Sequence, residues 1–263
     1  MSTILKSMEL INSNNKTWRI EIEGESEESR TTIIRTCFNH GRTTEKVVEG
    51  TRYDRNKQYI QKIMGQLRKG YRYRNLDANK WEPCFHGYVG RGYTGFMPIA
   101  ASKTRSDFYL IRVKGDFEDE ILFHYDENGN LLDQDRLGAK RLTYRAHMDD
   151  DSSLILHSLI HLEKIFEVYD PDTKRLERTE DDRITHLFDQ KDDHSDISNG
   201  IRVDYIGYEA PSARGYFDIT DTEKDERIIR IFNEFTVQNA FCAFTSNRLI
   251  VHTDYGVLSI YNI

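Results

Sequence analysis

Cysteine and proline are scarce in this 263-residue chain, which has three cysteines and four prolines. The cysteines lie far apart and are odd in number, so neither a disulfide framework nor a cysteine-based zinc site is expected. No apolar run approaches the ~18 residues of a membrane-spanning helix, and the first residues lack the apolar core of a signal peptide. These absences predict a soluble, cytoplasmic protein without a metal centre or another cofactor.

Charge is distributed unevenly along the chain, although the net charge is only −7. Residues 1–80 hold 16 basic and 10 acidic side chains, a net +6, which leaves −13 for residues 81–263. Between residues 30 and 80 the basic excess rises to +9. A basic block on an acidic protein favours a polyanionic partner for that block alone. The alternative is that the two parts of the chain attract each other.

The first 75 residues change from a strand period to a helix period. Residues 17–23 alternate apolar and polar side chains, which predicts a half-buried strand with Trp18 in the core. Residues 31–38 and 44–49 are expected to form two further strands. Residues 52–69 place their apolar side chains in one stripe at helical spacing and leave a basic outer surface.

Residues 81–263 show no long helical stripe and are typical of many short strands joined by turns. Residues 126–130 and 170–174 have the composition of hairpin turns, and they start 44 residues apart. Propeller blades recur at roughly 40–50 residues, so this part has room for about four blades, the lower limit for a closed ring. A β-sandwich is the alternative. The expected strands are 108–113, 120–125, 153–162, 164–169, 184–188, 202–208, 215–219, 227–232, 240–244, 248–252 and 257–261.

Three short segments in the first quarter of the chain stand in the order of a known family. Residues 12–22 (NSNNKTWRIEI), 38–42 (FNHGR) and 67–71 (LRKGY) resemble the opening strand, the signature loop and the closing segment of bacterial WGR domains. The resemblance covers residues 8–73. We therefore expect an α+β WGR-like domain over residues 1–75, a linker over 76–95, and a mostly-β interaction domain, propeller-like or a sandwich, over 96–263.

The resemblance implies a role in binding nucleic acid. In the WGR domains of DNA-break-sensing poly(ADP-ribose) polymerases, the signature Trp packs on the terminal sugar and the Arg links DNA to neighbouring domains. By position His40 replaces that Trp and Arg42 is the Arg. Imidazole offers less stacking surface than indole, so a general contact with the phosphate backbone is expected instead. The predicted nucleic-acid-binding residues are His40, Gly41, Arg42, Lys46, Arg52, Lys57, Lys62, Arg72 and Arg74.

Two of these assignments have a purely structural alternative. Gly41 can simply shape the loop while Arg42 pairs with a carboxylate of the second domain. Arg72 and Arg74 alternate with Tyr71 and Tyr73, which is a pattern that stacks bases and neutralises phosphates. The same alternation is equally typical of a half-buried strand with one solvated face.

Motifs for catalysis and metal binding are weak. The glycine-rich residues 87–95 do not follow the GxGxxG pattern and no helix is expected after them. His157 and His161 have the spacing of a helical zinc motif but lack its glutamate. The acidic clusters at 149–151 and 192–194 do not match an EF-hand loop and are interpreted as solvated loops. No catalytic residue is predicted.

The sequence thus favours a non-catalytic, nucleic-acid-associated adaptor. Its first domain would contact a phosphate backbone, and its β domain would engage a protein partner or a second copy of the chain. The main alternative is a protein-interaction subunit without nucleic-acid contact. An enzyme with a site in the β domain is a third hypothesis.

Overall fold

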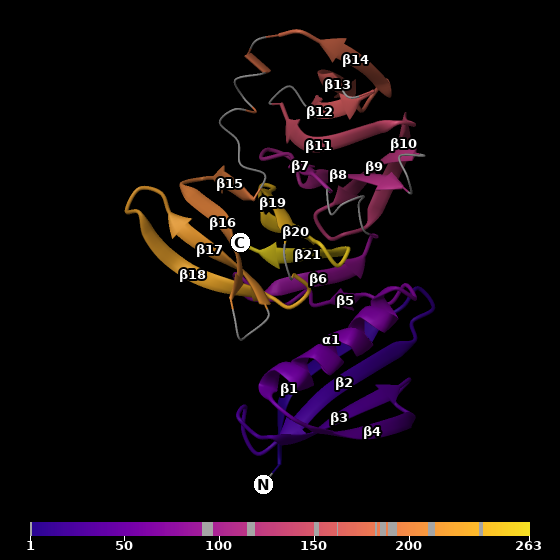
Figure 1. The fold of residues 1–263 in the computed structure, drawn as a ribbon, viewed down its shortest axis with the longest axis vertical. Helices are drawn as coiled ribbons and strands as arrows, with labels where there is room; N and C mark the ends of the chain where they lie inside the picture. Colours follow the sequence, from indigo (N-terminus) through magenta and orange to yellow (C-terminus); the bar gives the residue numbers. More distant parts are fainter. Residues whose placement is uncertain are drawn as a thin grey trace.

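The computed structural model describes residues 2–90, 97–114, 119–149, 153–161, 163–181, 183–184, 188, 194–209, 214–236 and 239–263. The chain forms two parts (Figure 1): an N-terminal sheet with one long helix, and a larger part made of four further sheets. Within these residues no helix combines the length and the apolar character needed to cross a membrane.

The N-terminal sheet is an antiparallel meander of β1 (Thr3–Ile11), β2 (Thr17–Gly24), β3 (Thr31–Phe38) and β4 (Arg42–Glu49). Alternating side chains point to opposite faces of such a sheet. In β2 the residues that alternate with charged ones are buried, including Trp18, which is 5% exposed. The prediction that Trp18 belongs to the core is confirmed.

Helix α1 (Arg52–Leu67) begins at a capping box. The Thr51 hydroxyl accepts a hydrogen bond from the Asp54 backbone N–H at 3.3 Å, and the Asp54 carboxylate accepts one from the Thr51 backbone N–H at 3.0 Å. These bonds to the Thr51 backbone and side chain lower the pKa of Asp54. Two of the free amides at the helix start are thereby satisfied. The chain leaves the helix through Gly70, whose φ of 86° favours glycine.

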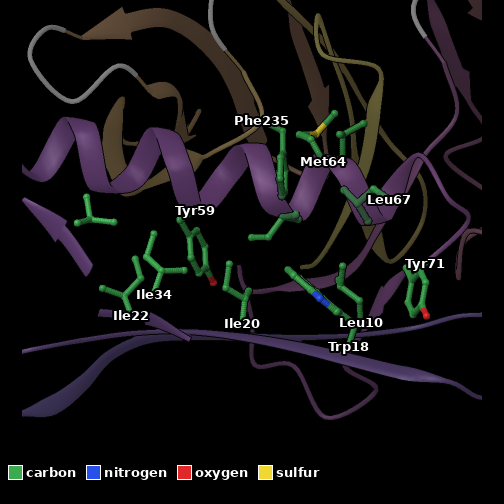
Figure 2. Close-up of a cluster of buried hydrophobic side chains, with 13 residues drawn as sticks. Leu10, Trp18, Ile20, Ile22, Ile34, Tyr59, Met64, Leu67, Tyr71 and Phe235 are labelled. Carbon is green, nitrogen blue, oxygen red and sulfur yellow. The ribbon is translucent and has the colours of Figure 1, made fainter. Parts of the chain in front are cut away.

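The helix covers one face of the N-terminal sheet (Figure 2). Trp18, Ile20 and Ile22 of β2 lie beneath it, and Tyr59 points down from the helix toward the sheet. Phe235, from the far end of the chain, joins the same cluster from above the helix. The core of the N-terminal part is therefore completed by the larger part.

The larger part consists of four antiparallel sheets, and in the first three the strands run in sequence order from the inside outwards. The innermost strands are neighbours: β7 lies beside β11 and β19, and β15 lies beside β19. This arrangement is propeller-like. The strands are β7 (Ile99–Ala101), β8 (Asp107–Lys114), β9 (Asp119–Asp126), β10 (Leu131–Gly138), β11 (Arg141–Met148), β12 (Leu154–Ile160), β13 (Glu163–Asp170), β14 (Arg175–Thr179), β15 (Ser195–Ser198), β16 (Ile201–Glu209), β17 (Arg214–Asp221), β18 (Glu226–Asn233), β19 (Ala240–Phe244), β20 (Arg248–Thr253) and β21 (Val257–Asn262).

The last sheet joins the two ends of the larger part. Its order is β19-β20-β21-β6-β5, where β6 (Pro83–Tyr88) pairs with β21, and β5 (Tyr73–Arg74) pairs with β6. The last three strands of the chain thus form the inner part of this sheet, and two early strands, β6 and β5, form its outer part. Residues 76–95, which were expected to form a linker, contain β6. The strand that pairs with β6 lies about 170 residues further along the chain, so this pairing joins the two ends of the larger part.

A buried charge cluster connects the first two sheets of the larger part. Arg141 of β11, 4% exposed, forms ion pairs with Glu120 of β9 at 2.6 Å and with Glu167 of β13 at 2.5 Å. The Thr143 backbone N–H and hydroxyl donate to Glu120 at 2.6 and 2.7 Å. Ser158 accepts from Arg141 at 3.1 Å. Each charged group has partners, as burial requires.

The predicted fold class, an α+β domain followed by a separate β domain, is wrong. The chain is nearly all β, and α1 contributes 16 residues. Five sheets carry the architecture, and the first of them includes a strand, β1, that no part of the prediction anticipated. The helical period of α1 was visible in the sequence, but one helix covering one sheet does not set the class of the whole chain.

Other differences concern the larger part. β7, β10, β11, β14 and β15 were not expected as strands. In β10, LLDQDRLG does not alternate apolar and polar residues, and none of its residues is buried. The expected strand at 184–188 and the acidic cluster at 192–194 fall largely outside the described residues, as do residues 91–95 of the glycine-rich stretch and 150–151 of the first acidic cluster.

Candidate functional site

Three of the predicted basic residues lie along the line where α1 packs beside β4. The Lys46 ammonium donates to the Gln58 side chain of α1 at 2.7 Å, which fixes the two elements against each other. Lys62 follows Gln58 by one helical turn and therefore lies on the same side of α1. Arg42 precedes Lys46 by four residues in β4 and shares its face of the sheet.

The orientation of Arg42 follows from the strand register. Arg42 pairs with Phe38, and Phe38 pairs with Trp18, so all three lie on the helix-covered face. The Phe38 ring contacts Tyr71 edge-on at 6.3 Å, yet 39% of Phe38 is exposed. Since β4 and α1 are joined by only Gly50 and Thr51, they run in opposite directions. Arg42 therefore lies near the C-terminal end of the helix.

The surface between α1 and β4, called here the basic seam, carries no carboxylate. Its positions alternate along the strands and recur every three to four residues along the helix. Gly65 has open space around its α-carbon, so nothing covers the helix there. The seam consists of Thr36, Phe38, Arg42, Thr44 and Lys46 of the sheet and Gln58, Gln61, Lys62, Gly65, Gln66 and Lys69 of the helix side.

The cations of the seam differ in their contacts. Lys46 is held by a neutral amide, and the Thr36 and Thr44 hydroxyls bond each other at 2.6 Å. Arg42 and Lys62 form no ion pair within the described part of the chain. No carboxylate among the described residues therefore neutralises their charge.

The opposite face of the same sheet has the reverse arrangement. Arg35 of β3 forms ion pairs with Glu23 and, at 2.8 Å, with Glu45 of β4. Arg19 pairs with Glu21 on the same face. The glutamates beside it raise the pKa of Arg35, the hydrogen bond to Glu45 being the main cause. On this face the basic side chains are occupied by carboxylates.

His40 and Gly41 form the turn between β3 and β4, next to Arg42. The φ of His40 is 54°, in the left-handed region, and its Nε2 lies 3.3 Å from the Thr17 hydroxyl. The Asn39 side chain accepts from the Thr17 backbone N–H at 3.1 Å. The turn is thus tied to β2, and His40 remains exposed at its tip.

The two predicted cations in the first half of α1 differ in their relation to the seam. Arg52 is at the opposite end of α1, where it pairs with Glu27 at 3.5 Å and Glu28 at 3.7 Å. Lys57 is exposed on α1 and precedes Gln61 by one helical turn, so it lies at the outer edge of the seam, roughly 100° around the helix from Gln58. The structure therefore keeps Arg52 away from the seam and places Lys57 at its edge.

Arg72 and Arg74 lie where the two parts of the chain meet. The Arg72 backbone pairs with Ile11 of β1, and the Arg74 guanidinium donates to Asn130 at 2.5 Å. Tyr71 is buried and Tyr73 half-buried, while both arginines are exposed. This pattern fits the half-buried strand rather than a stacking platform.

Sequence reasoning missed Lys69, Phe38 and the glutamines of the seam. Lys69 lies seven residues after Lys62, a spacing that puts both on one side of the helix. That spacing was the available signal. The exposure of Phe38 had no such signal, because the residue ends an apolar strand.

Histidines and acidic groups form no metal site within the described residues, where no set of three potential ligands converges. His157 contacts the Tyr144 hydroxyl and stacks on Phe166 with ring centres 4.3 Å apart. His161 lies in a turn with a φ of 50°. Neither the strand nor the turn gives these two side chains a helical zinc geometry.

Comparison with known proteins adds no family. No family model matches the chain, and no curated protein does so either. The predicted membership of the WGR family is therefore wrong: the ordered short matches were each compatible with any strand, turn or helix end of similar composition.

Solved structures of low similarity cover most of the chain. A hydrazine synthase of Kuenenia stuttgartiensis matches 86% of the chain at 11% identity and a TM-score of 0.25. The Dos1 propeller matches 99% of the chain at 8% identity and a TM-score of 0.27. The chain spans 53% and 54% of those two proteins. The propeller domain of the Trilobed protease from Pyrococcus furiosus matches 99% at 10% identity and 0.23. At such scores the assignment of a propeller-like fold rests on strand order and contacts alone.

Proposed function

We propose that the protein is a nucleic-acid-associated adaptor, in which the basic seam contacts a phosphate backbone and the propeller-like part engages a protein partner. The observation that supports this is the seam itself: cations, amides and hydroxyls without a carboxylate, on a chain of net charge −7. Contacts of such side chains with phosphate and sugar groups carry no sequence information. Binding without sequence preference is therefore expected.

Salt dependence provides the test of the seam. Each cation that neutralises a phosphate releases a counterion, so the affinity falls with salt at a slope of roughly 0.9 per contact. Loss of one phosphate-contacting cation lowers the salt slope by about 1. The variant R42Q/K46Q/K62Q, which removes three cations, is therefore expected to lower the slope by about 2–3 and to weaken binding at least tenfold. Fluorescence anisotropy with labelled duplex, single-stranded and nicked DNA and with RNA measures both quantities.

The matched control is K164Q/R175Q/R178Q, which removes three exposed cations of β13 and β14. If the control weakens binding as much as the seam variant, the effect is one of net charge and the seam is not the site. No binding of the wild-type protein to any of these nucleic acids at low salt would sink the proposal.

A second candidate, a protein-assembly subunit without nucleic-acid contact, is favoured by β18. This strand lies at the edge of its sheet, and Ile228 and Phe232 on it are 49% and 46% exposed. An exposed apolar edge strand is a ready partner for a strand of another protein. Two results together would favour this candidate over the first. A stoichiometric protein partner would lose its binding to I228S/F232S, and the seam variant R42Q/K46Q/K62Q would bind nucleic acid no differently from the wild type.

A further inference from the structure

A cavity of about 210 Å³ lies beside the first turns of α1, at the end of the helix opposite to Arg42. β1, β2, the loop after β2 and the helix all contribute to its wall. The cavity is lined by Leu5, Lys6, Ile22, Glu27, Arg52, Arg55 and Asn56. Three cations and one carboxylate thus face a small space whose remaining walls are apolar or amide.

Arg55 is the buried member of this set. Only 2% of it is exposed, and its Nη2 donates to the Glu27 carboxylate at 2.8 Å and to the Glu27 backbone carbonyl at 3.2 Å. Its Nε and Nη1 have no hydrogen-bond partner among the described residues. Buried guanidinium N–H groups without acceptors are costly, so an arrangement of this kind calls for an explanation by a ligand.

Among the carboxylates that pair with the cations of this cavity, Glu27 lines it, whereas Glu28 and Glu234 do not. Lys6 pairs with Glu234 from the larger part and lies over the Tyr59 ring at 5.0 Å. Arg52 shares the Glu27 carboxylate with Arg55, at 3.5 Å from its Nε, and its Nη1 lies 3.7 Å from Glu28, which does not line the cavity. In the cavity wall Glu27 thus stands beside two guanidinium groups, and an oxyanion has more oxygens to offer them.

We propose that this cavity binds the phosphoryl group of a small phosphate-bearing molecule. The planar guanidinium groups of Arg55 and Arg52 suit phosphate oxygens, since arginine binds them in pairs of parallel bonds. The Asn56 amide, also buried, adds a neutral donor at the wall. The space equals that of about seven water molecules, which is enough for a phosphate and below the ~300 Å³ of drug-sized pockets.

Glu27 is the competitor for this site. Its side chain is 48% exposed, so it can turn toward solvent when an anion takes its place on Arg55. The negative charge of the Glu27 carboxylate also repels an anion bound in the cavity. Removing the charge of Glu27 is therefore expected to strengthen binding, which is the opposite of what loss of a structural contact would do.

The test is calorimetric titration of the full chain with inorganic phosphate, and in a second arm with O-phosphoserine, which separates a free phosphate from a phosphomonoester. Glu27→Gln is expected to tighten phosphate binding about tenfold, as removal of a nearby unit charge does. Arg52→Gln and Arg55→Gln are expected to weaken it at least tenfold. Arg178→Gln, an exposed cation elsewhere, is the matched control and leaves binding unchanged.

The proposal is overturned if Glu27→Gln binds no tighter than the wild type, or if Arg178→Gln weakens binding as much as Arg52→Gln. Should Arg55→Gln fail to fold, the Glu27 and Arg52 variants still decide. The site is independent of the proposed function: the seam variant R42Q/K46Q/K62Q must keep phosphate binding, and Glu27→Gln must keep the salt slope for nucleic acid.

Discussion

The buried charge cluster around Arg141 and the basic seam hold charge in opposite ways. In the cluster, Arg141 is enclosed by Glu120, Glu167 and two hydroxyl groups, and almost no water reaches it. In the seam, Arg42 and Lys62 stand beside amides and hydroxyls with no carboxylate opposite them. A charge of the first kind is tied to folding. A charge of the second kind is available to a ligand, so changes at the two places should be visible in different measurements.

The largest effect is expected at the buried cluster. Arg141→Ala leaves two glutamates buried without a cation, which costs about 3–5 kcal/mol of unfolding free energy. Denaturant unfolding measures this loss. Arg136→Ala provides the control, because Arg136 is 70% exposed although it also pairs with a carboxylate, that of Asp119. Its loss is expected to stay below about 1 kcal/mol; equal losses would erase the distinction between the two kinds of charge.

An intermediate effect is expected from buried histidines on acidification. Burial lowers the pKa of His86 to about 3 and that of His252 to about 4, from 6.5. Below pH 6.5 the unfolded chain therefore binds more protons than the folded one, and stability is lost as the pH falls. Each histidine contributes about 1.4 kcal/mol per pH unit.

Unfolding free energies measured between pH 7 and 5 check this expectation, since the aspartates lose their charge mainly at lower pH. His252→Gln should reduce the slope by about half. An unchanged slope in His252→Gln would mean that this imidazole is not held neutral by burial.

The smallest effect is expected in the seam. Arg42→Gln should change the unfolding free energy by less than about 0.5 kcal/mol, as for surface positions without a partner. Arg35→Gln, on the opposite face of the same sheet, should lower the unfolding free energy more than Arg42→Gln does, because its ion pairs with Glu23 and Glu45 are lost. Thermal melts of the two variants make the comparison. A loss above 1 kcal/mol at Arg42 would show that it is a structural residue.

Local patterns in the sequence predicted the elements well. The strand expected at residues 31–38 is Thr31–Phe38, and the helix expected at 52–69 is Arg52–Leu67, because alternation and helical spacing are set by neighbours in the chain. β10 was not predicted as a strand because an exposed outer strand needs few apolar residues. The pairing of β6 with β21 was not predicted because no local rule connects Pro83–Tyr88 to Val257–Asn262.

The candidate sites were predicted less well, for a related reason. The basic block pointed to Arg42, Lys46 and Lys62, but charge counts along the sequence cannot tell which cations meet carboxylates in space. Arg52 carried the same expectation and is bound by two glutamates. Arg55 was expected on the basic outer surface of the helix and is buried instead, because an arginine in a basic helix gives no sign that it will be buried.

The pairing of β6 with β21 also bears on how the chain is made. β6 emerges from the ribosome long before β21, and until β21 follows, the edge that it will occupy is open to other chains. Closure of so long a loop is slow, so the last sheet is expected to form late. Partly synthesised or partly folded chains would then be the species most prone to aggregate.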